Sequence, residues 1–255
     1  MKPELHDAFL RCPLAHRALH DVVQGRPENS MAAIRAACAA GYGIEIDVQR
    51  SADGEAMVFH DDDLGRLTRE TGDIHLRAAQ DLKAINLRGG DEGIPTLADV
   101  LDLVAGRVPL LIEVKDQDGA MGTSVGLLEQ RVAETLAGYH GPVAVMSFNP
   151  HSVRKMAAYG PGIARGLVTG APEVRSWGLP PEETERLSCI ADFDPAACSF
   201  ISHEVDDLTN PRVAALKQQG APILCWTVKS AEQEAQARQI ADNITFEQYL
   251  APFPA

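Results

Sequence analysis

The sequence lacks the features that would place it in several common classes. Its five cysteines include no Cys-x-x-Cys pair, so neither a zinc knuckle nor a disulfide framework is indicated. Basic residues are few: 23 Lys and Arg stand against 36 Asp and Glu, and the net charge is −13. This balance argues against nucleic acid as a general partner, because a phosphate backbone selects basic surfaces. It does not exclude a small anionic substrate, because local basic groups or a metal can outweigh a distant surface charge.

Long apolar runs are also missing. No run approaches the roughly 18 residues that a membrane span needs, so no stable membrane insertion is expected. The segment 1–7 lacks the charged-then-apolar pattern of a signal peptide. We therefore expect a soluble protein in the reducing cytoplasm. Nothing in the sequence indicates an oligomeric state.

Strand-like and helical patterns alternate along the chain. Apolar runs typical of strands lie near 13–17, 43–49, 56–60, 108–115, 142–148, 163–169, 199–205, 221–228 and 243–246. Helices are predicted between most of them, the first capped by Asn29 or Ser30 and ended by Gly41, the others over 97–105, 124–137, 150–158, 210–219 and 230–240. Such alternation predicts parallel βαβ units, and about eight strands in 255 residues favour a closed (β/α)₈ TIM barrel formed by one domain, 1–255.

Residues 52–95 interrupt this rhythm. The segment is polar, rich in Asp, Arg and Gly, and too long for an ordinary loop of a barrel. The turn Asp53-Gly54 predicts that 56–60 pairs back as a short hairpin strand. We therefore expect a small insertion after the second barrel strand, which would carry His60 over the mouth of the barrel.

Several chemically active side chains fall at the ends of the predicted strands. Glu45 and Asp47 are two residues apart on one strand, so both point to the same face, about 6.6 Å apart. Neighbouring carboxylates repel each other unless a hard cation holds them. Glu113 is a third carboxylate on a strand, and the histidines His16 and His60 end two others. Because barrel active sites lie at the carboxyl ends of the strands, this set predicts a metal-assisted hydrolytic site.

Structural explanations exist for the same residues. Glu45 and Asp47 could be solvated carboxylates at a strand end, and Glu113 and Lys115 could be only an ion pair. His16 could be a structural histidine of a barrel. What favours the site is that these residues occur together and within apolar runs.

A series of short motifs resembles the glycerophosphodiester phosphodiesterase family. The matching strings occur in the family's order and span nearly the whole chain: Ala15-His16-Arg17, Pro27-Glu28-Asn29-Ser30, Gly43-Ile44-Glu45-Ile46-Asp47-Val48, Asp53-Gly54, Val58-Phe59-His60-Asp61, Ile94-Pro95-Thr96-Leu97, Ile112-Glu113-Val114-Lys115, Ser147-Phe148 and Cys225-Trp226-Thr227-Val228. Each string alone is common, but the ordered set is specific.

The resemblance implies a role for each residue of the predicted site. Glu45, Asp47 and Glu113 would hold a divalent cation, Mg²⁺ or Ca²⁺, and His16 and His60 would be the acid/base pair. The substrate-binding candidates are Arg17, Glu28, Asn29, Lys115 and Trp226. Of these, Arg17 and Lys115 suit phosphate oxygens, Glu28 and Asn29 could instead belong to a helix cap, and Trp226 could be core packing or a wall for the alcohol portion. Asp61 is expected to orient a histidine by a hydrogen bond.

The expected activity is that of a phosphoric diester hydrolase in lipid and glycerol metabolism. It would act on a small phosphodiester and release sn-glycerol 3-phosphate and an alcohol. One alternative is phospholipase D-like hydrolysis of lysophospholipids or other phosphodiesters on the same site. Another is a catalytically inactive barrel that binds a phosphoester or a partner protein.

Three departures from the family pattern stand out. Ala18 replaces the usual Gly after His-Arg, which could alter a turn. Thr245 is followed by Phe246 where the family has Thr-Asp, and we expect this to affect barrel closure or the pocket rim more than the chemistry. The stretch 170–198 matches least and is expected to shape substrate choice.

Overall fold

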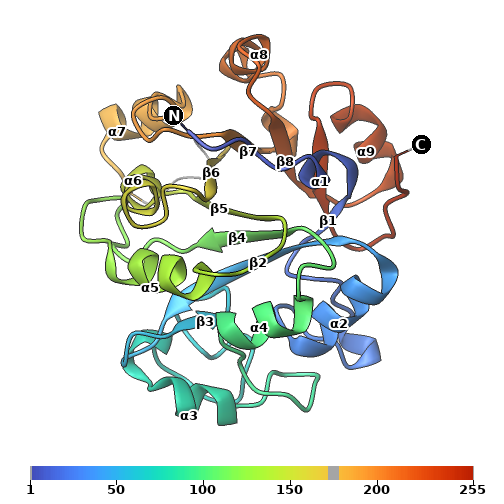
Figure 1. The fold of residues 1–255 in the computed structure, drawn as a ribbon, viewed down its shortest axis with the longest axis vertical. Helices are drawn as coiled ribbons and strands as arrows, with labels where there is room; N and C mark the ends of the chain where they lie inside the picture. The colour runs from blue at the N-terminus through green and yellow to red at the C-terminus, as the bar shows by residue number, and fades with distance from the viewer. Residues whose placement is uncertain (1, 172–177, 255) are drawn as a thin grey trace.

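Eight parallel strands close into a barrel in the computed structural model, which describes residues 2–171 and 178–254 (Figure 1). The strands are β1 (Leu14–Ala15), β2 (Gly43–Arg50), β4 (Leu110–Val114), β5 (Val143–Ser147), β6 (Ala164–Thr169), β7 (Phe200–Glu204), β8 (Ile223–Val228) and β9 (Asn243–Phe246). Closure depends on β1, which pairs in parallel with β2 on one side and with β9 on the other. The predicted TIM barrel is confirmed.

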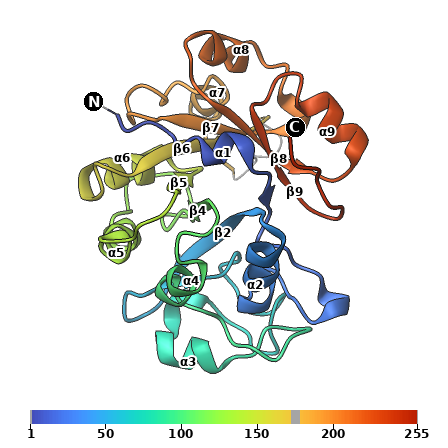
Figure 2. The same ribbon diagram turned by 45° about the vertical axis from the view of Figure 1, so that its right-hand side comes forward.

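Helices cover the outside of the strands, as Figures 1 and 2 show. They are α2 (Met31–Ala40), α4 (Leu97–Val104), α5 (Leu127–Leu136), α6 (Pro150–Tyr159), α7 (Pro181–Ser188), α8 (Pro211–Gln218) and α9 (Ala231–Ala237). Helix α2 is capped by the Ser30 hydroxyl, which accepts the Ala33 N–H, and not by Asn29. It ends at Gly41, whose φ of 80° is left-handed and favours glycine.

The amino end of the barrel is filled with apolar side chains. Leu14, Leu111, Phe200 and Leu224 point inward from their strands and form one cluster with Phe9. Phe9 belongs to α1 (Ala8–Arg11), a four-residue helix that the sequence analysis did not predict. The Asn243 side chain donates to the carbonyls of Phe9 and Cys12 at 2.6 Å each, which ties α1 to the barrel. This packing closes the amino end of the barrel.

Residues 52–95 form an annex with its own apolar cluster. In it, β3 (Ala56–Val58) pairs antiparallel with β2, and a 3₁₀ turn (Ile74–Leu76) and α3 (Ala79–Ala84) follow. The cluster includes Met57, Phe59, Leu64, Ile74, Leu82 and Ile94. In Figures 1 and 2 α3 lies at the lower end of the molecule, at the opposite end from α8. The Phe59 N–H donates to the Asp47 carbonyl at 3.0 Å, which fixes the next residue, His60, beside the end of β2.

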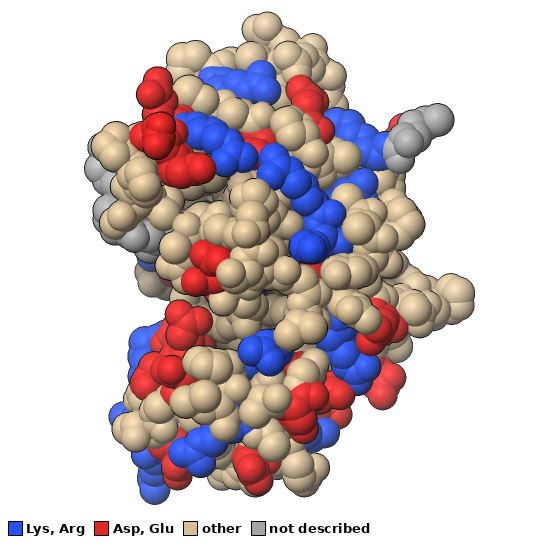
Figure 3. All heavy atoms as spheres, turned by 90° about the vertical axis from the view of Figure 1, so that its left-hand side faces the viewer, with Lys and Arg blue, Asp and Glu red and all other residues tan. Residues whose placement is uncertain are grey.

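The other differences from the sequence prediction are local. The predicted strands agree with the observed ones to within a few residues, whereas α3 and α7 were not predicted. Part of the stretch expected to shape substrate choice, residues 172–177, lies outside the described residues. Among the helices of the described part, none combines the length and apolar character required to cross a membrane. The face drawn in Figure 3 carries both acidic and basic groups, with uncharged surface between them.

Gly166 is predicted to be essential for packing inside the barrel. A Cβ atom added there would lie 2.5 Å from Cε2 of the Phe200 ring, closer than real side chains approach. We expect Gly166→Ala to lower the free energy of unfolding by about 1–3 kcal/mol, since overpacking forces the ring or the strand to move. Urea denaturation measures this loss.

Gly162 supplies the matched control, because a Cβ there would meet nothing within 4 Å. Gly162→Ala should leave the urea midpoint nearly unchanged, and Phe200→Leu should partly restore the Gly166→Ala protein. Equal midpoints for the two alanine variants would show that the contact with Phe200 is unimportant.

Candidate active site

Three carboxylates meet at the carboxyl ends of β2 and β4. Glu45 and Asp47 point inward from β2, and the register of the two strands sets Asp47 directly beside Glu113. One oxygen from each of the three lies within 4.8 Å of the others. All three residues are buried, with exposures of 2%, 1% and 7%. The predicted ligand set is therefore brought together at the mouth of the barrel.

Lys115 balances part of this charge. Its Nζ lies 2.7 Å from Asp47 Oδ1 and 2.7 Å from Glu113 Oε1. Burial alone would raise the pKa of Asp47, but the charges of Lys115, His60 and Arg17 outweigh burial and hold that pKa well below its usual range. The two carboxylates in turn raise the pKa of Lys115 against the effect of its own burial. Asp47 and Lys115 are thus ionised together.

The negative charge of Glu45 is less well offset by its neighbours. Its Oε2 accepts the backbone N–H of Arg17 at 2.9 Å. Burial, and then the negative charges of Asp47 and Glu113, raise the pKa of Glu45 well above its ordinary value. Three buried carboxylates are therefore more negative than the nearby side chains can offset. Carboxylate oxygens are the ligands that Mg²⁺ and Ca²⁺ prefer, so the donor set and its unbalanced charge fit a divalent cation.

Asn29 supports Asp47 from behind. It is fully buried, its Nδ2 donates to Asp47 Oδ2 at 2.9 Å, and its Oδ1 accepts the Asp47 N–H at 3.3 Å. Its φ of 58° is left-handed, a conformation that asparagine tolerates better than most residues. These contacts hold the Asp47 carboxylate in place, whereas the sequence analysis offered Asn29 as a substrate-binding residue or a helix cap.

A chain of ion pairs runs from the barrel to the annex. Arg17 Nη1 lies 2.7 Å from Glu28 Oε1, and Glu28 also binds Arg66 at 2.8 Å. Arg66 continues to Asp61 at 2.5 Å, and Asp61 Oδ1 lies 2.6 Å from His60 Nδ1. Burial of Asp61 is outweighed by His60 and Arg66, which lower its pKa. The expected hydrogen bond between Asp61 and a histidine is present, and Arg66, which the sequence analysis did not single out, anchors it.

His16 has a partner that the sequence analysis also missed. Its Nδ1 lies 2.7 Å from Glu247 Oε2, in the segment directly after β9. Burial lowers the pKa of His16, and the hydrogen bond to Glu247 opposes that shift. The available signal in the sequence was a carboxylate directly after the last predicted strand, 243–246.

One pocket of about 640 Å³ joins these groups. Its lining includes His16, Arg17, Glu28, Glu45, Asp47, His60, Glu113, Lys115, Trp226 and Glu247. Trp226 is half-buried, its Nε1 donates to the Ser202 carbonyl at 3.0 Å, and its ring meets the Phe148 ring edge-on at 5.5 Å. An adjoining pocket of about 560 Å³ shares His60, Glu113 and Lys115 with the first. The two pockets therefore meet at these three residues.

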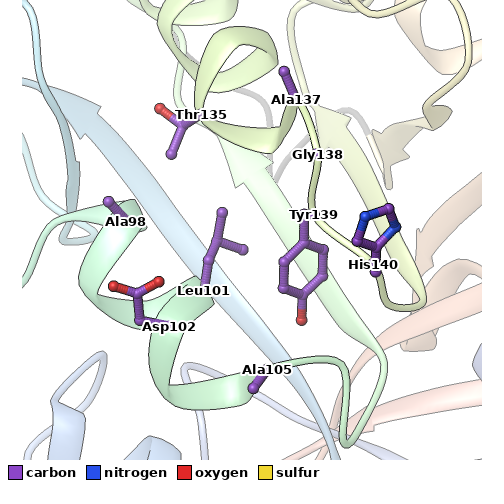
Figure 4. A pocket seen from close by; sticks show the side chains of 9 residues that line it. All are labelled: Ala98, Leu101, Asp102, Ala105, Thr135, Ala137, Gly138, Tyr139 and His140. Carbon is purple, nitrogen blue, oxygen red and sulfur yellow. The ribbon is translucent and has the colours of Figure 1, made fainter.

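A further hollow of about 430 Å³ lies on the outside of the barrel, between α4 and the turn after α5 (Figure 4). It is lined by Ala98, Leu101, Asp102, Ala105, Thr135, Ala137, Gly138, Tyr139 and His140. Tyr139 has a structural role, because its hydroxyl accepts a hydrogen bond from the Gly106 N–H at 3.0 Å. This hollow contains none of the residues predicted for catalysis.

Comparison with known proteins agrees with the motif analysis. A family model described as the glycerophosphoryl diester phosphodiesterase family matches residues 16–244. A glycerophosphodiester phosphodiesterase of Caldanaerobacter subterraneus is 29% identical over 162 residues, which cover 60% of this chain and 65%, slightly under two thirds, of that protein.

Solved structures share the fold. A phosphodiesterase of Oleispira antarctica, in complex with the product sn-glycerol-3-phosphate, aligns over 94% of both chains with a TM-score of 0.76 and 24% identity. A glycerophosphodiester phosphodiesterase of Thermotoga maritima covers 92% of this chain and 94% of its own, with a TM-score of 0.68 and 20% identity. The family resemblance inferred from the motifs is confirmed.

Lys115 is predicted to stabilise the fold through the carboxylates it contacts. Lys115→Met leaves two buried carboxylates without their cation, which we expect to lower the free energy of unfolding by about 3–5 kcal/mol at neutral pH. Asp47 has a pKa below its ordinary 3.8, so this contribution is present above about pH 4 and is lost as pH falls through the lowered pKa. Denaturation at several pH values should show that the difference in free energy of unfolding between the unaltered protein and Lys115→Met becomes smaller in acid.

An exposed lysine serves as the control for this test. Lys83 contacts Asp99 at 2.9 Å with 42% and 33% of the two side chains exposed. Lys83→Met should cost at most about 1 kcal/mol, because solvent screens surface ion pairs. Similar losses in both variants would contradict the role given to Lys115.

Proposed function

The chain belongs to the glycerophosphoryl diester phosphodiesterase family, and on that premise we propose that it hydrolyses glycerophosphodiesters to sn-glycerol 3-phosphate and an alcohol. The observation that carries the proposal is the convergence of Glu45, Asp47 and Glu113 with His16 and His60 in one pocket. The carboxylates can hold a divalent cation that would balance a phosphate, and the histidines can accept a proton and donate one. The product bound in the Oleispira relative is consistent with this reaction.

The phosphate would be held at the charged end of the pocket. Glu45, Asp47 and Glu113 are the proposed ligands of a divalent cation, Mg²⁺ or Ca²⁺, which would polarise the phosphoryl oxygens and offset developing charge. Arg17 and Lys115 line the same pocket and can donate to phosphate oxygens. Asn29 acts indirectly, since its amide fixes Asp47.

The two histidines divide the proton transfers. Burial lowers the pKa of His16, so its ring is neutral near pH 7 and can accept the proton of the attacking hydroxyl, from water or from the substrate's own glycerol. His60 would donate a proton to the oxygen of the leaving alcohol. In both rings Nδ1 is hydrogen-bonded to a carboxylate, which leaves Nε2 to contact the substrate. Trp226, beside Phe148, would form a wall for the alcohol portion.

Exposed apolar residues favour one other candidate, hydrolysis of lysophospholipids at the same site. Val23, in the segment after β1, is 97% exposed, and Leu250, after β9, is 69% exposed. Both segments follow adjacent strands at the mouth of the barrel. An acyl chain could pack against such a rim, whereas a deacylated diester has no acyl chain to place there.

Turnover should depend on both histidines. Release of glycerol 3-phosphate from glycerophosphocholine, measured with Mg²⁺ or Ca²⁺, is expected to fall by roughly 10²–10⁴-fold in His16→Ala and in His60→Ala, because each variant loses one proton transfer. Release from lysophosphatidylcholine in the same assay tests the second candidate.

His140→Ala is the matched control for these variants. His140 lies in the hollow of Figure 4, and we expect its loss to leave turnover unchanged. Rates like those of the unaltered protein in His16→Ala would refute the assigned chemistry. Absence of release from either substrate with any metal would refute the proposed activity.

Metal binding should depend on the three carboxylates. Calorimetric titration with Mg²⁺ or Ca²⁺ is expected to show affinity falling in Glu45→Gln, Asp47→Asn and Glu113→Gln by more than the roughly 10–100-fold that loss of an outer partner of a metal ligand costs. Asp102→Asn, in the outer hollow, should bind as tightly as the unaltered protein. EDTA should stop turnover, and excess metal should restore part of it in the carboxylate variants. Turnover that persists in EDTA would contradict a metal-dependent site.

A further inference from the structure

The two proposed catalytic histidines have the same kind of support, supplied by unrelated parts of the chain. His60 Nδ1 bonds Asp61, whose carboxylate is held by Arg66. His16 Nδ1 bonds Glu247 at 2.7 Å, and the other oxygen of Glu247 lies 3.0 Å from Lys229 Nζ. Each histidine is therefore hydrogen-bonded to a carboxylate, and that carboxylate is in turn paired with a cationic side chain.

The barrel seam explains how Glu247 reaches His16. Side chains of β9 alternate, so Ile244 and Phe246 pack outward under the helices, while Thr245 and Glu247 line the pocket. β9 pairs with β1, and the His16 N–H donates to the Phe246 carbonyl at 2.9 Å. The backbone bond sets the position of His16, and the side-chain bond sets the orientation of its ring.

Resting on the proposed function, we propose that Glu247 is a positioning residue for His16, and that Lys229 holds Glu247 in place. A carboxylate at 2.7 Å from Nδ1 accepts a hydrogen bond from the Nδ1–H, which selects the tautomer with a free lone pair on Nε2. When Nε2 then takes a proton from the attacking hydroxyl, the ring becomes positive and Glu247 stabilises it. The Glu247 carboxylate remains ionised throughout, in the manner of the carboxylate in a Ser-His-Asp triad.

Several charged groups face this pair. Burial lowers the pKa of His16 most strongly; Arg17 lowers it further, while Glu247 and Asp47 raise it. Around Glu247 lie His16, Lys229 and His20, whose Nε2 is 3.7 Å from Glu247 Oε2. The hydrogen bond from His16 and the nearby His20 ring are the chief reasons that the pKa of Glu247 is lowered. Loss of the Glu247 charge should therefore make His16 harder to protonate.

The test combines the ring's tautomer with kinetics in Glu247→Gln. In the unaltered protein, ¹⁵N NMR of the His16 ring should show the proton on Nδ1. In Glu247→Gln the His16 pKa should fall, and kcat for glycerophosphocholine should drop about 10–100-fold with little change in KM, because the phosphate contacts remain. Glu247 lines the same pocket, but in the described part of the chain its side-chain partners are His16, His20, Lys229 and Gln248 rather than the proposed phosphate ligands, so a purely structural role would not produce this pattern.

Two other variants separate this role from general effects. Glu55→Gln makes the same chemical change at a residue paired with Arg131, outside the pocket, and should move neither the His16 pKa nor kcat. Lys229→Met keeps the bond between Glu247 and His16, so the His16 pKa should not fall, in contrast to Glu247→Gln. Lys229 is 53% exposed, so a modest decrease in kcat is expected there.

The outcomes are distinct. A His16 proton on Nε2 in the unaltered protein would overturn the proposal without any variant, even if Glu247→Gln failed to fold. An unchanged His16 pKa and kcat in Glu247→Gln would also overturn it. If the unaltered protein hydrolysed no phosphodiester, the proposed function would fail, whereas the NMR result would still decide whether Glu247 sets the tautomer.

Discussion

The burial of negative charge at the mouth of the barrel is the constraint on which the site depends. Two carboxylates from β2 and one from β4 lie within 4.8 Å of each other and almost out of contact with water. Their mutual repulsion in a medium of low dielectric is large, so the surrounding backbone and side chains are arranged to offset it. Lys115 bridges two of the carboxylates, and the N–H of Arg17 is directed at the third.

Some of this arrangement is held in strained backbone. Arg17, Ala18 and Asn29 have φ values of 53°, 66° and 58°, a region that residues with side chains rarely occupy. At Arg17 that conformation belongs to the turn whose N–H meets Glu45, and at Asn29 it belongs to the residue whose amide meets Asp47. Ala18 explains why the family favours glycine after His-Arg. Here the position is left-handed, and the Ala18 methyl is nevertheless buried against the core.

The sequence was sufficient for features set by nearby residues. Strand positions followed from apolar runs, Ser30 was one of the two cap candidates because of its hydroxyl, and Glu45 with Asp47 followed from the two-residue period of a strand. The link that Arg66 makes between the annex and the barrel could not be assigned, because Asp61 is five positions away but Glu28 is 38 positions away and meets Arg66 only through the path of the annex. Glu247 was missed for the same reason, since its contact with His16 exists only once β9 closes on β1. The expectation that the departure after Thr245 affects barrel closure or the pocket rim more than the chemistry did not include this contact.

The seam between β1 and β9 also has a consequence for synthesis of the protein. His16 and Glu247 are 231 positions apart, so the ribosome makes the segment that holds one long before the segment that holds the other. Until β9 has emerged from the exit tunnel, β1 and β8 each present an unpaired edge. The nascent barrel is then an open sheet, exposed to pairing with other chains. The last strand to be translated therefore ends this vulnerable interval in the same event that completes the pocket.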